Sequence, residues 1–336
     1  MTRLSSKLKT VVWVGLVLTC TSGCQLDEGT ANLFDFFLFK GELVSELYAV
    51  IPATTLDYAL YGQALSEEGA VLDAYGPSGF AVDKEGIIWI GNGSHVYLPN
   101  AFKPSIHQFH PNGEHLGTFV YPENQYFTDF FTQDGELLAI NADPNLFSGQ
   151  TVRLDSSGHL KEEQQWGEGL DAFEDAYNTI TPGEDGPILV KAFGQGFAVM
   201  NEEGWVEEGV GIEEAGGRYQ IKGTQLFIND LLVDELDLQS LEESGAVGGM
   251  VLIGFTHERE GICIAKEILI PDVQLKNTVT TTINCFDSKG NQRASIEIPI
   301  EDEVAYNRHY VLGEEEDVVY TMETKEGFIL IHRIRL

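Results

Sequence analysis

Short runs of apolar or alternating residues, each closed by a polar turn, recur along most of this chain. One series of turns consists of an apolar residue, a polar tripeptide and a glycine, and it ends in turn at Gly69, Gly113, Gly158, Gly204 and Gly290. The spacing is about 45 residues, and about twice that before the last turn, where a weaker copy ends at Gly245. Glycine at this position supplies the positive φ that closes a tight hairpin.

A second series of turns interleaves with the first and is centred on Gly86, Gly135, Gly186, Gly223, Gly261 and Glu315. Each period therefore holds two tight hairpins, which means four short strands. This pattern, with almost no amphipathic helix, predicts an all-β fold: a six-bladed β-propeller with four-stranded antiparallel blades. The next turn of the first series would fall where the chain ends. We therefore expect an N-terminal strand within Leu56–Tyr75 to close the last blade.

The chain divides into three predicted parts: a signal peptide over residues 1–23, a tether and N-terminal extension over 24–55, and the propeller over 56–336. Basic residues precede an uncharged run over 10–18, which is typical of a secretory signal. The run is followed by TSGC, residues 21–24, which resembles a bacterial lipobox and implies lipidation of Cys24 after cleavage. An ordinary cleavage site after Gly23 is the alternative. Gln25 follows, and resemblance to Gram-negative lipoproteins then implies the outer membrane, facing the periplasm or the cell surface.

The chain is strongly acidic, with a formal net charge of -33. Such a field repels nucleic acid and anionic lipid, so we expect no nucleic-acid partner. Adaptation to high salt, affinity for cations or basic partners, and simple solubility all remain open. Acidic residues are spread along the whole chain, which favours a general property of the surface.

Two cysteines remain in the exported body once Cys20 and Cys24 are set aside, and these are Cys263 and Cys285. They lie in two strand-like runs, and the midpoint between them, Gln274, is also the centre of the connection between the runs. If the runs pair as a hairpin, the cysteines face each other, and we predict a disulfide. The alternative is two free, small apolar residues.

The segment GPSGFAVDKEGIIWIGN, residues 76–92, is followed by IHQFHPNGEHLGTF. Together they resemble one blade of the NHL-type and gluconolactonase-like six-bladed propellers. The gluconolactonase-like group implies a metal at the channel mouth, held by carboxylate and amide side chains from different blades. Those ligand positions cannot be aligned with this chain, where Asp73 is the one carboxylate close to the first strand of that blade.

If the tight turns share one end of the propeller, the long connections share the other, and binding residues usually lie on such loops. These connections are 92–104, 141–149, 166–178 and 300–309. The candidate binding residues on them are His95, Tyr97, Asp143, Asn178 and Arg308. Oxygen ligands for calcium could come from Asp171, Glu174 and Asp175, although their spacing matches no dedicated calcium loop and a solvated acidic run is the alternative.

Motifs for common enzyme chemistries are missing from the sequence: it has no Gly-x-Ser-x-Gly elbow, no His-Glu-x-x-His helix and no phosphate-binding loop. We therefore predict a non-enzymatic platform on the outer membrane that binds a protein or a small-molecule ligand and reaches the membrane through its lipid anchor. The alternative is a metal-dependent propeller hydrolase of lactonase or esterase type, and calcium is the cofactor for which candidate ligands can be named. A quinone-dependent sugar dehydrogenase has no residues to support it.

Overall fold

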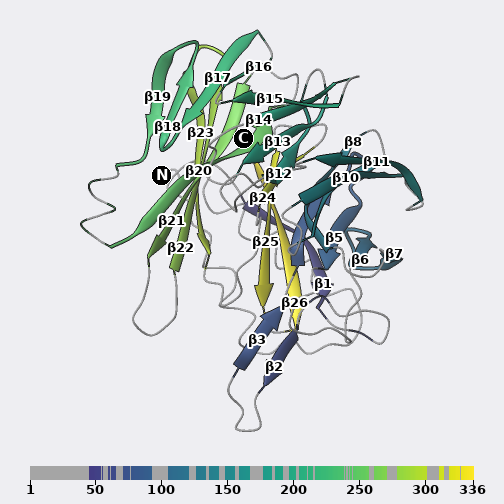
Figure 1. Ribbon diagram of the computed structural model, residues 1–336. Helices are drawn as coiled ribbons and strands as arrows, with labels where there is room; N and C mark the ends of the chain where they lie inside the picture. Colours follow the sequence, from purple (N-terminus) through teal and green to yellow (C-terminus); the bar gives the residue numbers. More distant parts are fainter. Residues whose placement is uncertain are drawn as a thin grey trace, which may run out of the picture. The chain divides into compact units, whose positions relative to one another are not determined.

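The structure is a computed structural model that describes the chain from Ser45 to its end, with internal gaps. The gaps are 54, 56–59, 61, 66–70, 76, 93–104, 121–125, 134–135, 144–147, 156–158, 167–176, 184–185, 192–196, 202–203, 210, 215, 238, 240, 242, 244, 257–260, 271–277, 301–309, 314–317 and 326. The described residues form β-strands almost throughout (Figure 1). No helix among them has the length and hydropathy that a membrane crossing requires.

The strands pair into six four-stranded antiparallel sheets and one two-stranded ribbon. The first sheet contains β4 (Pro77–Val82), β5 (Ile88–Asn92), β6 (Ser105–Phe109) and β7 (His115–Val120). The second contains β8 (Tyr126–Gln133), β9 (Glu136–Asp143), β10 (Ser148–Leu154) and β11 (Leu160–Trp166). The third contains β12 (Tyr177–Thr181), β13 (Ile188–Lys191), β14 (Phe197–Asn201) and β15 (Gly204–Gly209).

The fourth sheet contains β16 (Gly211–Glu214), β17 (Gly217–Lys222), β18 (Gln225–Ile228) and β19 (Leu231–Glu235). The fifth contains β20 (Val247–Phe255), β21 (Gly261–Ile270), β22 (Thr278–Asp287) and β23 (Gln292–Ile300). The last sheet has the order β24 (Tyr310–Leu312), β25 (Val318–Lys325), β26 (Phe328–Arg335) and β1 (Ser45–Pro52). The ribbon pairs β2 (Gly62–Leu65) with β3 (Val71–Tyr75).

Four-stranded antiparallel sheets in chain order, with their first strands meeting, make this fold a β-propeller. Strand β4 contacts β8, β8 contacts β12, β20 contacts β24, and β24 returns to β4. A hydrogen bond of 3.1 Å from the Thr181 hydroxyl of β12 to the Ile253 carbonyl of β20 closes a ring of five first strands, so the structure does not confirm the predicted number of six blades. The sheet β16–β19 packs on its neighbours through a buried cluster that includes Ile188, Tyr219 and Leu252.

An N-terminal strand closes the last sheet, as predicted, but it is not the expected segment. Strand β1 pairs antiparallel with β26 and lies upstream of Leu56–Tyr75, within the stretch assigned to the N-terminal extension (Figure 1). The expected segment instead contains the β2–β3 ribbon, where Gly62 and Tyr75 pair with each other. The physical reason is the alternation in β1, which buries Ala49 and Ile51 between two sheets.

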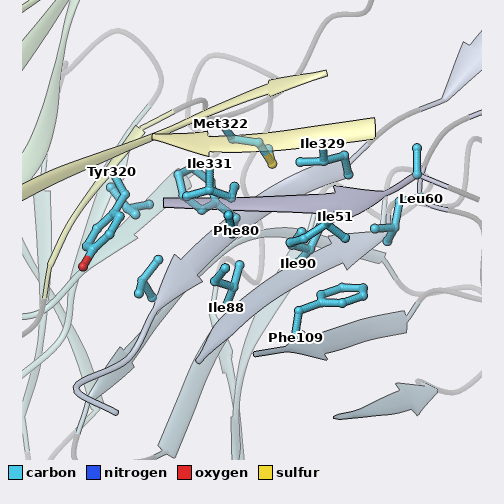
Figure 2. Close-up of a cluster of buried hydrophobic side chains, with 14 of the residues drawn as sticks. Ile51, Leu60, Phe80, Ile88, Ile90, Phe109, Tyr320, Met322, Ile329 and Ile331 are labelled. Carbon is cyan, nitrogen blue, oxygen red and sulfur yellow. The ribbon is translucent and has the colours of Figure 1, made fainter. Parts of the chain in front are cut away.

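That buried layer joins the last sheet to the first. Figure 2 shows Ile51 of β1 among side chains of both sheets, with Phe80, Ile88 and Ile90 from the first and Ile329 from the last. All five are fully buried. Burial of this apolar surface, at roughly 25 cal/mol per Å², is the main force that closes the ring here.

Tight turns occur where the glycine pattern predicts them. Gly86, Gly113 and Gly290 have φ values of 80°, 86° and 85° and lie between consecutive strands of a sheet. Two assignments were wrong. Gly223 joins β17 to β18, the second and third strands of its sheet, and Gly245 precedes β20 rather than closing a hairpin. The cause is the fourth sheet, whose strands and three connections are all short. Its turns therefore do not follow the spacing of about 45 residues seen elsewhere.

Candidate functional site

Most of the predicted binding residues lie outside the part of the chain that the structure describes. These are His95, Tyr97 and Arg308, the carboxylates Asp171, Glu174 and Asp175, and the lipidation candidate Cys24. For Asp143 and Asn178 the backbone is described and the side chain is not. The role of all these residues, in ligand binding or lipidation, therefore stays a prediction. The structure shows only the strand ends at which the predicted loops begin.

The described strands show where those loops begin. Asp143 is the last residue of β9, and Asn178 is the second residue of β12. Each lies at the end of its sheet opposite the tight turns. The same end carries the connections over 93–104, 167–176 and 301–309. The expected connection over 141–149 is shorter than predicted, because β9 and β10 stay paired up to Asp143 and Ser148.

A buried carboxylate, which the sequence analysis did not single out, lies where the first strands meet. Asp129 of β8 is 1% exposed, and its Oδ2 accepts a hydrogen bond of 2.9 Å from the Ile180 amide of β12. A Cβ added to Gly79 of β4 would lie 3.5 Å from Asp129 Oδ1, an ordinary contact distance, so the carboxylate lies directly beside β4. One acidic residue within the apolar run YFTDFF was the signal that could have identified it.

Asp129 therefore links the first strands β8 and β12 and lies beside a third, β4. Buried carboxylates persist when hydrogen bonds replace their lost hydration, and the Ile180 amide supplies one of these bonds. Calcium takes six to eight oxygen ligands, which one carboxylate cannot provide. The described residues contain no group of three or more histidine, cysteine or acidic side chains placed to hold a metal. In this region the arrangement serves to hold strands together.

A second polar group runs across β6 and β7. His107 Nε2 lies 2.9 Å from the Ser105 hydroxyl, and His107 Nδ1 lies 2.9 Å from the hydroxyl of Thr118, which in turn lies 3.0 Å from His115 Nε2. His107 is 3% exposed. Burial, with a smaller contribution from the charge of His115, lowers the pKa of His107 to about 4. This imidazole is therefore neutral near pH 7, and hydroxyl groups satisfy both of its nitrogens.

The predicted disulfide is confirmed. Cys263 of β21 and Cys285 of β22 are directly opposite in the strand register, and a disulfide joins them. Both residues are buried. The bond links two neighbouring strands of a single sheet, so it stabilises the fold rather than forming part of a ligand site.

Comparison with known proteins leaves the family open. No protein-family model matches the sequence, and no curated protein is similar to it. A protein of unknown function from Bacteroides caccae is 9% identical, over 75% of this chain and 94% of that one, with a TM-score of 0.43. Glutaminyl cyclase from Myxococcus xanthus is 10% identical, over 87% and 97% of the two chains, with a TM-score of 0.42.

The Dos1 propeller is 11% identical to this chain, over 81% of this chain and 62% of that one, with a TM-score of 0.31. Likenesses at this level carry no argument about function. The propeller assignment follows from the sheets themselves. The resemblance to NHL-type and gluconolactonase-like propellers stays a prediction.

Proposed function

We propose that this chain is a six-bladed β-propeller, anchored to the outer membrane of a Gram-negative bacterium by a lipid on Cys24, that binds a protein or a small-molecule ligand without catalysis. One observation carries the binding function: short turns lie at one end of the sheets, and the connections over 93–104, 167–176 and 301–309 lie at the other. A rigid scaffold with long loops gathered at one end is the usual arrangement of a recognition surface.

The proposed number of six blades is supported by the six four-stranded sheets in the described part of the chain. The first strands of five sheets close a ring by themselves, which is the arrangement of five blades, and the sheet β16–β19 packs beside β13 and β20 through its apolar cluster. We assign this sheet as the fourth blade. Its four short strands then account for the irregular spacing of turns between Gly204 and Gly290.

Site-specific photocrosslinking in cells tests the binding function. A photoreactive residue would replace His95, Tyr97 or Arg308 at the end with long connections, and, as matched controls, Lys84, Asn112 or Lys289 at tight turns. We expect discrete crosslinked products from the first set and none from the second. Products from the tight-turn positions alone, or equal products from both sets, would contradict the proposed face.

The lipid anchor is tested by mass spectrometry of the mature protein purified from membranes. We expect an N-terminal cysteine, Cys24, carrying the mass of a diacylglyceryl group and fatty acid. A mature chain that begins after Cys24, or an unmodified Cys24, would end the lipoprotein proposal. The crosslinking result does not depend on this outcome, so anchor and binding face are judged separately.

A further inference from the structure

Three large apolar side chains are exposed on the last sheet. Leu47 and Val50 of β1 are 46% and 40% exposed, and Phe328 of β26 is 48% exposed. Removing them from water would be favourable, since each apolar side chain contributes on the order of 1 kcal/mol or more when buried. Exposed apolar residues that gather on one face of a sheet mark an interaction surface.

The strand register places these side chains on a single face. Val50 pairs with Leu330 and Leu47 pairs with His332, while Phe328, Leu330 and His332 alternate along β26. Side chains two residues apart on a strand share a face, so the three exposed residues lie on one face, together with Leu330 and His332, which are each 7% exposed. We call Leu47, Val50 and Phe328 the β1 patch. The opposite face of the same strands is the buried layer shown in Figure 2.

Charge near the patch differs from that of the whole chain. On the face of the patch, Lys325 of β25 pairs with Phe328 in the register and Glu323 pairs with Leu330, whereas the chain as a whole has a formal charge of -33. Lys325 forms an ion pair with Glu323, while Arg333 and its partner Glu46 lie on the opposite face of the strands. The patch is therefore nearly neutral locally. A zwitterionic surface suits it better than an anionic one, which the acidic chain would repel.

The length of chain before β1 indicates which surface this is. Cys24 and Ser45 are 21 positions apart, so the span between them cannot exceed about 75 Å. Strand β1 is the first described element after the proposed lipid. The anchor therefore keeps this strand within reach of the bilayer.

We infer that the β1 patch rests on the zwitterionic phospholipid surface to which the chain is tethered, and so fixes the orientation of the propeller on the membrane. This inference rests on the proposed lipid anchor. An amphipathic surface that lies in the interface buries its apolar side chains about 5–10 Å into the headgroup region. Three such side chains bind weakly by themselves, and the tether raises their effective concentration at the bilayer.

Fluorescence quenching by brominated lipid tests the contact. Phe328→Trp and Leu160→Trp would each be made in the full chain, purified from membranes and reconstituted in phosphatidylcholine vesicles with or without brominated acyl chains. Leu160 is a matched control because it is 52% exposed on β11, in another sheet. The parent protein supplies the background of its own tryptophans.

We expect the fluorescence added by Phe328→Trp to fall about two-fold in brominated vesicles, because the ring would lie about 5–10 Å into the headgroup region, close to the brominated chains. The fluorescence added by Leu160→Trp should stay within about a tenth. No quenching of either, or equal quenching of both, would overturn the inference. A blue shift for Phe328→Trp that follows protein concentration without lipid would assign the patch to self-association instead. If mass spectrometry finds no lipid on Cys24, quenching after adding the mature chain to preformed vesicles still decides the patch itself.

Discussion

Three aspartates explain at the level of single residues why the turn pattern recurs. Asp83, Asp155 and Asp287 each follow an apolar residue and precede a turn glycine by three positions. In each case Oδ1 accepts the amide hydrogen of the residue after the glycine, at 2.8, 3.0 and 2.9 Å. The sequence therefore predicts these turns well, because aspartate and glycine fix them locally. At Asp287 these bonds, led by those from Asn291, hold the carboxyl pKa at about 2.

Other residues could not be assigned from the sequence, because their role comes from partners far along the chain. Asp129 bonds to Ile180, and its position in the run YFTDFF does not show which strand it will meet. His107 is fixed by Ser105 and Thr118 on two strands. Its burial depends on the packing of neighbouring sheets. That is a tertiary property and carries no local signal.

His107 makes a testable contribution to acid stability. Its pKa is about 4 in the folded chain and about 6.5 when unfolded, so the unfolded state takes up the proton first. The stabilisation present above pH 6.5 is therefore lost as pH falls towards 4, by up to about 3 kcal/mol. We expect His107→Gln to reduce this dependence of the free energy of unfolding on pH between 6.5 and 4, measured by urea denaturation at a series of pH values. His159→Gln, at an exposed histidine, should leave it unchanged; equal effects of both would refute the assignment.

At the level of elements, the strand and turn pattern could be predicted and the identity of the closing strand could not. Period and turn chemistry are local, so they give the hairpins and the facing cysteines. Closure pairs β1 with β26 from opposite ends of the chain. Both Ser45–Pro52 and Leu56–Tyr75 contain short strands, and the choice between them depends on which one fits the apolar layer around Phe80 and Ile329.

Alternation along β1 gives a sharp test of closure. Ile51 is fully buried between sheets, whereas its neighbour Val50 is 40% exposed. We expect Ile51→Ala to lower the free energy of unfolding by about 2–4 kcal/mol, through lost burial and the cavity left behind. Val50→Ala should change it by no more than about 0.5 kcal/mol. Chemical denaturation of the two variants measures both, and the reverse order would mean that β1 is registered on the other face.

The disulfide links two adjacent strands, and its effect on stability can be measured. It links residues 22 positions apart in adjacent strands, and closing a loop of that size in the unfolded chain contributes about 3 kcal/mol. We expect the double substitution Cys263→Ala and Cys285→Ala to lose about that amount in thermal or chemical unfolding. A thiol assay on the unfolded, unreduced parent should find neither cysteine free. Two reactive thiols there would contradict the bond.

At the level of the whole molecule, the formal net charge of -33 affects the stability of the folded chain. Mutual repulsion of surface carboxylates opposes the compact state, and salt screens it. If the acidic residues act as a general surface charge, sodium chloride and calcium chloride at equal ionic strength should raise the melting temperature to a similar extent, by about 5 °C. Calorimetry should then show no saturable calcium binding. Tight binding of one calcium ion that sodium cannot replace would instead point to a convergent site on the long connections, with Asp171, Glu174 and Asp175 as its first candidates, and Asp171→Asn would be the variant expected to abolish it.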